Sequence, residues 1–446
     1  MSHRWNLRIA LLLAVSVGTV AAQAPAEGPP AGTTVALQCG HLLDVESGRL
    51  LNASTVVIQA GKVQQVQSGI QSPAAAKLID LGSQTCLPGL IDTHTHLTEE
   101  ISKDYYSQVF RWNIADYAVH STLYARRTLL AGFTTVRNLG DVANESVALR
   151  DAINAGVVVG PRIYTAGRAI GSTGGHADAT NGYRADLAGD PGPRVGIINS
   201  AEDAVKAVRQ HYKDRVDVIK IMPSGGVLDV GSNGENPQLT IEEIRAVVNT
   251  SHDYGFIVAA HAHGAEAIKR AVLAGVDSIE HGTFLNAEDM KLMVEHGTWY
   301  VPTIIAGDFV ARQAKVPGYY PPQVAAKALA IGPQILDTAG KAYKAHVRIA
   351  FGTDAGVYPH GENAHELELM VQAGMPALFV LQAATINAAR LLRHDKELGS
   401  IAAGKLADVV AVEGNPLDDI SVMKHVSFVM KEGVVYKVGS VATPQS

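Results

Sequence analysis

The chain has 446 residues, of which 47% are hydrophobic and 18% charged, and its formal net charge is −6. This composition is typical of a globular protein with a large core, and it excludes a disordered chain. The 37 lysines and arginines are outnumbered by 43 aspartates and glutamates and form no basic run, so we expect no nucleic-acid partner.

The first 22 residues predict a signal peptide. Arg4 and Arg8 flank the start of a short apolar run over residues 9–20, and Val20-Ala21-Ala22 offers small residues for cleavage before Gln23. An uncleaved N-terminal anchor is the alternative. We expect residues 1–22 to direct export to the periplasm or beyond, and residues 23–32 to form a linker. No later apolar stretch is long enough to span a bilayer, so the mature chain is expected to bind no membrane.

Short β-rich runs occupy both ends of the mature chain. Residues 35–37, 55–58 and 62–66 lie near its start, and residues 408–412 and 434–437 near its end. We expect residues 33–86 and 396–440 to pair into one small β-sandwich-like domain. The two cysteines, Cys39 and Cys86, fall in its first part, and the sequence leaves open a disulfide or a pair of buried thiols.

Between these ends, over residues 87–395, apolar strand-like runs alternate with helical stretches such as 201–212, 241–252 and 265–274. Eight strands are predicted around Leu90, Thr135, Ile163, Ile219, Val258, Ile279, Val301 and Ile349. This pattern indicates an α/β fold, a (β/α)8 TIM barrel. A doubly wound open sheet is the alternative, but no Gly-x-Gly-x-x-Gly segment follows the first strand.

The first strand of the predicted barrel ends in His94-Thr95-His96. Because side chains along a strand alternate between its two faces, both imidazoles point the same way. Two imidazoles at one strand end can bind a divalent metal, although this spacing is also common without one.

Further predicted strands also end in residues of metal-ligand type. Lys220 lies in an apolar run, where a lysine is costly unless it is neutralised or paired. His261 and His263 end the fifth strand, His281 the sixth and Asp354 the eighth. The carboxyl ends of barrel strands meet at one mouth, so we expect these side chains to converge there. Strand alternation does not distinguish His261 from His263, because both face the same way.

Together these motifs resemble those of the amidohydrolase superfamily. The resemblance covers about residues 35–437 and rests on residues 87–96, Lys220, His261, Glu280-His281-Gly282 and Gly352-Thr353-Asp354-Ala355-Gly356. The sequence is most similar to the imidazolonepropionase-like branch, which contains metal-dependent Xaa-Pro and Xaa-Arg/Lys dipeptidases and ochratoxin amidases. Residues 171–176 and 358–363 also resemble this branch.

The resemblance implies a pair of divalent metal ions, Zn²⁺ first, with Mn²⁺ or Co²⁺ as alternatives. The implied ligands are His94, His96 and Asp354 for the more buried ion, His261 and His281 for the second, and Lys220, carboxylated by carbon dioxide, as a bridge. The family spacing to Glu280-His281-Gly282 favours His261 over His263 as the ligand. His263 is then expected to line the substrate pocket, where relatives often carry a tyrosine that contacts the substrate carboxylate.

The implied activity is amide hydrolysis by a metal-bridging hydroxide, with Asp354 moving the proton to the departing nitrogen. His176, after the third strand, is a candidate hydrogen-bond donor to the oxyanion. His360, after the eighth strand, is a candidate substrate contact. For each of these histidines, the alternative is a hydrogen bond to a local partner with a structural role only. We expect a small-molecule substrate with a free carboxylate, a dipeptide or an N-acyl amino acid, with ochratoxin A included. The alternatives are a cyclic amidase or lactonase on the same site, and a non-catalytic binding barrel. Because family members often form assemblies, we expect a homo-oligomer.

Overall fold

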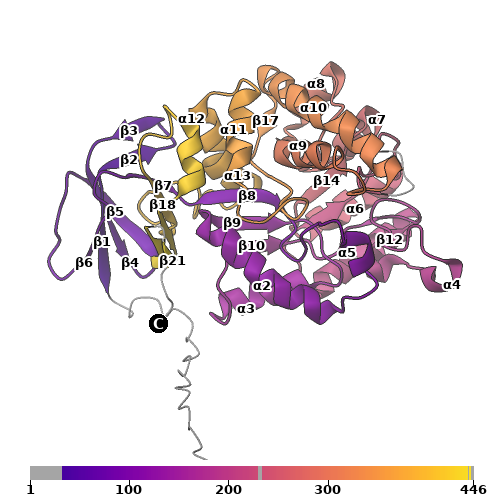
Figure 1. Cartoon of the computed structure of the whole chain (residues 1–446), viewed down its shortest axis with the longest axis horizontal. Helices are drawn as coiled ribbons and strands as arrows, with labels where there is room; N and C mark the ends of the chain where they lie inside the picture. Colours follow the sequence, from indigo (N-terminus) through magenta and orange to yellow (C-terminus); the bar gives the residue numbers. More distant parts are fainter. Residues whose placement is uncertain (1–32, 230–233, 440, 443–446) are drawn as a thin grey trace, which may run out of the picture.

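The computed structural model describes residues 33–229, 234–439 and 441–442, so the expected signal peptide and linker lie outside the described residues. Within those ranges no helix combines the length and apolar character needed to cross a membrane. Figure 1 shows a small all-β part, built from the indigo and yellow ends of the chain, beside a larger α/β part.

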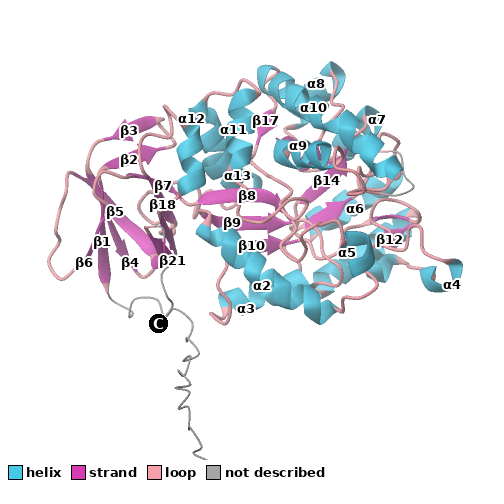
Figure 2. Ribbon diagram, viewed as in Figure 1, coloured by secondary structure: helices cyan, strands magenta, loops and turns pink. Residues whose placement is uncertain are grey.

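The all-β part is a sandwich of two sheets formed by both ends of the chain (Figure 2). One sheet has the order β5-β4-β1-β6, with β1 (Thr34–Cys39), β4 (Ser54–Gln59), β5 (Lys62–Ser68) and β6 (Lys77–Asp80). The other has the order β21-β20-β19-β18-β7-β2-β3, with β2 (His41–Asp44), β3 (Arg49–Leu51), β7 (Thr85–Pro88), β18 (Val409–Val412), β19 (Phe428–Lys431), β20 (Val434–Val438) and β21 (Val441–Ala442). Leu37 and Val56 of the first sheet share a buried cluster with Val409 and Phe428 of the second. The expected β-sandwich-like domain from both chain ends is confirmed.

A disulfide between Cys39 and Cys86 joins the two sheets, at a sequence separation of 47 residues. Cys39 ends β1 and Cys86 lies in β7, and both are fully buried in the sandwich core. Of the two states that the sequence leaves open, the structure has the disulfide.

Replacing both cysteines, Cys39→Ser and Cys86→Ser, is expected to lower the free energy of unfolding by about 4 kcal/mol, because the crosslink no longer restricts the unfolded chain. Urea denaturation of the native and the doubly substituted protein measures this loss. The barrel should keep its fold, since the disulfide lies in the sandwich. Equal denaturation midpoints would contradict the stabilising role.

The larger part is a barrel of parallel strands. One sheet contains β8 (Leu90–Thr95), β9 (Phe133–Asn138) and β10 (Arg162–Thr165), and the other β13 (Ile219–Ile221), β14 (Val258–Ala262), β15 (Ser278–His281), β16 (Trp299–Val301) and β17 (Arg348–Ile349). Backbone hydrogen bonds join the two sheets on both sides: the Ile170 amide donates to the Lys220 carbonyl (2.8 Å), and the His96 amide to the Ala355 carbonyl (2.7 Å). All the predicted strands are present in the predicted order, so the (β/α)8 barrel is confirmed.

Helices surround this ring of strands (Figure 2). They are α2 (Ile114–Leu130), α3 (Glu145–Asn154), α5 (Ala201–Lys213), α6 (Ile241–Asp253), α7 (Ala265–Ala274), α8 (Ala287–His296), α9 (Ile304–Gln313), α10 (Pro322–Lys344), α11 (His365–Gln372), α12 (Ala377–Gln382) and α13 (Ala388–Leu391). The predicted helix over residues 265–274 coincides with α7. Gly275 ends α7 and Gly297 ends α8, both with positive φ, the left-handed conformation that glycine adopts without strain.

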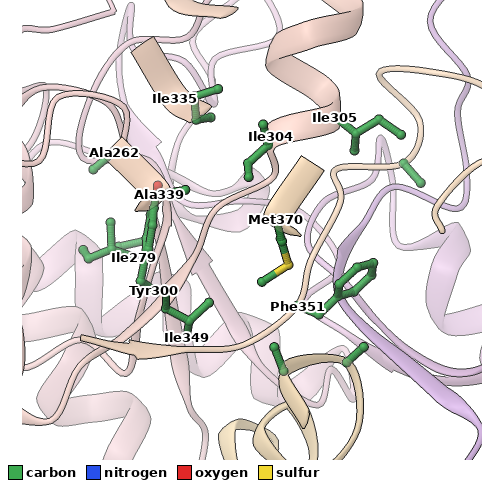
Figure 3. Close-up of a cluster of buried hydrophobic side chains, with 14 of the residues drawn as sticks. Ala262, Ile279, Tyr300, Ile304, Ile305, Ile335, Ala339, Ile349, Phe351 and Met370 are labelled. Atoms are coloured by element: carbon green, nitrogen blue, oxygen red, sulfur yellow. The ribbon is translucent and has the colours of Figure 1, made fainter. Parts of the chain in front are cut away.

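Apolar packing fixes α9 and α10 against the barrel strands (Figure 3). Ile304 and Ile305 begin α9, Ile335 comes from α10, and Tyr300 and Ile349 come from β16 and β17; all five are buried in one cluster. Such close packing restricts movement of the start of α9. The residue just before that start, Thr303, belongs to the site described next.

Candidate metal centre

The residues predicted as metal ligands come together at the carboxyl-terminal mouth of the barrel. They lie at the ends of strands or just beyond them: His94 and His96 on and after β8, Lys220 on β13, His261 on β14, His281 on β15, and Asp354 after β17. His94, Lys220, His261, His281 and Asp354 are all less than 9% exposed. These buried side chains thus form a polar cluster with little access for water.

The first group consists of His94, His96 and Asp354. Asp354 Oδ1 lies 3.3 Å from His94 Nε2 and 3.2 Å from His96 Nε2, and one ligand atom from each residue lies within 4.8 Å of the others. The two imidazoles share a face of the strand end, as the alternation of side chains predicts. Two ring nitrogens and a carboxylate oxygen so close together form a donor set that suits a divalent ion.

Lys220 links this group to the rest of the cluster. Its Nζ lies 3.5 Å from His94 Nε2, and the residue is 1% exposed. Burial lowers the pKa of the Lys220 amine to about 8, against the partly compensating charges of Glu280 and Asp354. The lysine therefore lies inside the barrel mouth. It does not extend to solvent, as a lysine at a strand end commonly does.

The second group consists of His261 and His281, whose ring centroids are 4.6 Å apart. His281 also lies 4.9 Å from the His94 ring. His281 Nδ1 bonds Thr303 Oγ1 at 2.8 Å, and His261 Nε2 donates to the Gly225 carbonyl at 3.2 Å. Burial lowers the pKa of both imidazoles well below the usual value, so they are neutral, which is the metal-binding form.

Three residues at this mouth have left-handed backbones that side-chain-bearing residues rarely adopt. The φ angles are +70° at His281, +52° at Thr303 and +61° at Asp354. Each such residue costs about 1–3 kcal/mol and persists only where its surroundings impose it. At His281 the left-handed backbone interrupts strand alternation, so that both Glu280 and His281 contact the cluster. Three of the ten non-glycine residues with positive φ among the described residues thus lie at the site.

A buried ion pair between Glu280 and Arg137 orients His94, and the sequence analysis assigned no role to either residue. Glu280 Oε2 accepts from His94 Nδ1 at 2.9 Å, and Glu280 Oε1 accepts from Arg137 at 2.8 Å. Burial tends to raise the pKa of Glu280, but Arg137 and His94 outweigh it and hold the pKa at about 2. Glu280 therefore fixes the proton of His94 on Nδ1 and leaves Nε2 for a metal. The Glu-His-Gly motif was a signal that could have found it.

The side chain of Glu366 holds the backbone that follows Thr303. Glu366, on α11, accepts from the amides of Ile304 (2.9 Å) and Ile305 (2.6 Å) at the start of α9. This side chain is fully buried, and burial raises its pKa well above the usual value. The first turn of α9, and with it the Thr303 hydroxyl that bonds His281, is thereby fixed in place.

The three residues predicted to contact substrate differ in their surroundings. The His263 ring stacks on His281 at 5.0 Å, and its Nδ1 bonds Thr283 Oγ1 at 2.8 Å. The His176 ring lies 4.4 Å from that of His261. His360 stacks on Tyr124 and donates from Nε2 to the Glu99 carbonyl at 2.9 Å. His263 and His176 thus join the cluster, whereas the contacts of His360 are with the neighbouring loop and helix, and its role stays a prediction.

The substitution His263→Ala is expected to change substrate preference and to leave the metal content intact. Burial lowers the pKa of His263 to about 3, so this ring is a neutral hydrogen-bonding group and not a cation for a carboxylate. We expect KM to rise by about tenfold for a substrate that bonds it, the loss of roughly one hydrogen bond. Steady-state kinetics on several amides and metal analysis check this. Loss of one metal would mean that His263, not His261, is the ligand.

With this geometry established, similarity to known proteins identifies the family. A model of the amidohydrolase family matches residues 85–438. The chain belongs to the amidohydrolase family.

One similar solved structure is that of an Xaa-Pro dipeptidase with methionine bound in its active site, which is 48% identical in sequence to this amidohydrolase. The match covers 91% of this chain and all of the dipeptidase chain, with a TM-score of 0.89. Ochratoxinase from Aspergillus niger is 34% identical over 372 residues, 79% of this chain and 75% of the relative, and its crystal structure has a TM-score of 0.83. Imidazolonepropionase from Treponema denticola is 23% identical over 401 residues, 82% of this chain and 87% of the relative. The expected imidazolonepropionase-like branch is confirmed.

Family membership makes this protein a hydrolase that acts on C–N bonds, and the residues at the barrel mouth fit the metal ions that such hydrolases use. The fit rests on the donor set. His94 and His281 are neutral imidazoles, each with one ring nitrogen bonded to a protein partner. The carboxylate of Asp354 lies between His94 and His96. Hydrogen bonds to the remote nitrogen are typical of metal-binding histidines.

Proposed function

We propose that this amidohydrolase cleaves the amide bond of a dipeptide or an N-acyl amino acid and releases the C-terminal amino acid. The observation that carries the proposal is the meeting, at one barrel mouth, of every side chain expected from the sequence to hold metal: His94, His96, Lys220, His261, His281 and Asp354. Packing alone does not account for this set of side chains, because burying polar groups lowers the stability of the fold unless they are paired.

The metal content that we propose is two divalent ions, with Zn²⁺ the first choice. His94, His96 and Asp354 would hold one ion, His261 and His281 the other, and Lys220 lies beside the first group. When bound, such ions lower the pKa of a water and polarise a carbonyl group.

Lys220 supports this proposal only in a modified form. An ammonium would repel cations, whereas a carbamate is an anionic oxygen ligand. To form it, the free amine adds to the carbon of carbon dioxide and one N–H proton leaves. Burial lowers the pKa of Lys220 to about 8, which favours the free amine over the unreactive ammonium.

Asp354 and His176 carry the proton and charge movements in this proposal. Burial tends to raise the pKa of Asp354, but His94 and His96 outweigh it and hold the pKa below its usual value. The carboxylate can therefore accept the proton of the attacking water and deliver it to the departing amide nitrogen. We assign to His176, whose ring lies beside that of His261, the hydrogen bond to the substrate carbonyl oxygen as negative charge develops.

The similarity to an Xaa-Pro dipeptidase and to ochratoxinase supports substrates whose amide nitrogen belongs to an amino acid with a free carboxylate. We include ochratoxin A, whose hydrolysis releases phenylalanine, as a second substrate of the same site. The natural substrate would be one of the linear amides in this class.

A panel of dipeptides and N-acyl amino acids, each paired with its methyl ester, tests the proposal on the zinc-loaded and the manganese-loaded enzyme. We expect the free acids to be hydrolysed and the esters to lose most of that activity. Turnover of lactones or cyclic amides, with none of the linear amides, would favour the cyclic amidase. A chain that retains no divalent metal after reconstitution would be a binding barrel.

We also propose that the chain works after export to the periplasm or beyond. The buried disulfide between Cys39 and Cys86 supports this, because such bonds persist in oxidising compartments. Cell fractionation of the expressing organism tests it: the protein should be found outside the cytoplasm with its N-terminus at Gln23. A cytoplasmic protein that retains residues 1–22 would contradict the proposal.

A further inference from the structure

His176 and Asp229 form a side-chain pair at the edge of the histidine cluster. His176 Nδ1 lies 2.8 Å from Asp229 Oδ1 and 2.9 Å from Oδ2, and the side chains are 23% and 17% exposed. An ionised carboxylate only accepts hydrogen bonds, so the Nδ1 proton of His176 is donated to Asp229. Nε2 is then the ring nitrogen left to meet a bound molecule.

The loop that carries Asp229 is shaped to hold this ring. Asp229 Oδ2 also accepts from the Gly226 amide at 3.0 Å, which closes a turn over residues 226–229. A Cβ on Gly226 would lie 2.3 Å from Cε1 of His176, so the loop backbone packs against the imidazole face where only glycine fits. On the other side, the His176 amide donates to Gln238 Oε1 at 2.8 Å.

Two groups from outside the loop fix its backbone. Lys327, on α10, donates to the carbonyls of Gly226 (3.1 Å) and Asp229 (2.6 Å). Tyr106, on α1 (Tyr105–Gln108), donates to the Leu228 carbonyl at 3.0 Å. The same loop contacts the metal cluster directly, because the Gly225 carbonyl accepts from His261 Nε2. One short segment therefore sets the position of His176 relative to His261.

We propose that Asp229 is the positioning residue of the catalytic site: it holds His176 through Nδ1 and fixes the orientation of the ring, so that Nε2 faces the bound substrate. The inference rests on the proposed amide hydrolysis. In this proposal Asp229 contacts neither the substrate nor the metal ions, and it affects catalysis only through His176.

The test is a double-mutant cycle with Asp229→Asn and His176→Ala, measured on any amide that the native enzyme hydrolyses. Asparagine keeps the shape of Asp229 and removes its charge and its fixed acceptor role. We expect kcat to fall about 10²-fold with KM and metal content unchanged, the loss typical of a misplaced catalytic group. The double variant should be no slower than His176→Ala alone, because Asp229 acts through that ring. Asp229→Glu, which restores a carboxylate, should recover part of kcat.

Asp277→Asn is the matched control. Asp277 has the same 17% exposure and also pairs with a histidine, His252, at 2.9 Å, but it precedes β15 and so lies at the opposite end of the strand from the cluster. This substitution should change stability and leave kcat unchanged. The inference is overturned if Asp229→Asn leaves kcat at the native value, slows the His176→Ala enzyme by a further 10²-fold, or acts by lowering the metal content. A native enzyme that hydrolyses no amide would instead overturn the proposed function.

Discussion

Replacing Lys220 with alanine is expected to abolish hydrolysis and to reduce the metal content of the purified protein. The side chain is fully buried beside His94, and in the proposed centre its carbamate supplies the anionic charge between two cations. Removing it leaves the imidazoles of His261 and His281 without a shared partner. Because bound metal contributes several kcal/mol to such reactions, we expect kcat to fall at least about 10³-fold. Activity assays and elemental analysis of the same preparation measure both losses.

The carbamate itself is tested by chemical rescue of Lys220→Ala. The cavity left by the side chain should admit a small carboxylate such as formate or propionate, and metal binding and part of kcat should return as its concentration rises. Lys431→Ala is the control, because Lys431 is also a buried lysine whose pKa burial lowers to about 8, but it lies on β19 and donates to the Gly160 carbonyl. It should retain full metal content. A Lys220→Ala protein that still holds two metals per chain would refute the bridging role.

The sequence was sufficient for the barrel and the metal-binding side chains because both follow from periodic rules. Strand alternation places His94 and His96 on one face, and a parallel barrel brings the ends of its strands to one mouth, so that Lys220, His281 and Asp354 converge. These rules depend only on the order of residues along each strand. They need no knowledge of side-chain rotamers or loop paths.

The orientation that the supporting residues impose could not be predicted, because it depends on contacts between distant segments. Glu280 meets Arg137 across the barrel, 143 residues apart in sequence, and Glu366 meets the start of α9. The left-handed backbone at Thr303 also cannot be predicted from the sequence, because threonine rarely adopts this conformation and tertiary packing imposes it. Asp229 follows no strand end and belongs to no motif. Sequence rules thus locate the groups that do the chemistry, whereas their orientation is set by the folded environment.

Asp354→Asn is expected to lower kcat by about 10²–10⁴-fold, the usual contribution of a proton-transfer group, with a much smaller change in KM. Asparagine is isosteric with aspartate, so the hydrogen bond from the residue 354 amide to the His94 carbonyl, 2.7 Å in the native protein, should persist. What is lost is a carboxylate that the neighbouring histidines keep ionised near neutral pH. Rates should be measured at saturating metal, with the occupancy of each sample determined, because Asp354 also belongs to the His94–His96 group.

Saturating metal separates the two roles of Asp354. If the residue acted only as a ligand, excess metal would restore both occupancy and kcat of Asp354→Asn; if it moves the proton, occupancy returns and kcat stays low. Asp289→Asn is the matched control: Asp289 is 1% exposed and caps the start of α8, where it accepts from the Asn286 amide at 3.2 Å. That variant should lose stability by about 1 kcal/mol and keep its turnover. Native kcat in a fully loaded Asp354→Asn enzyme would mean that another group carries the proton.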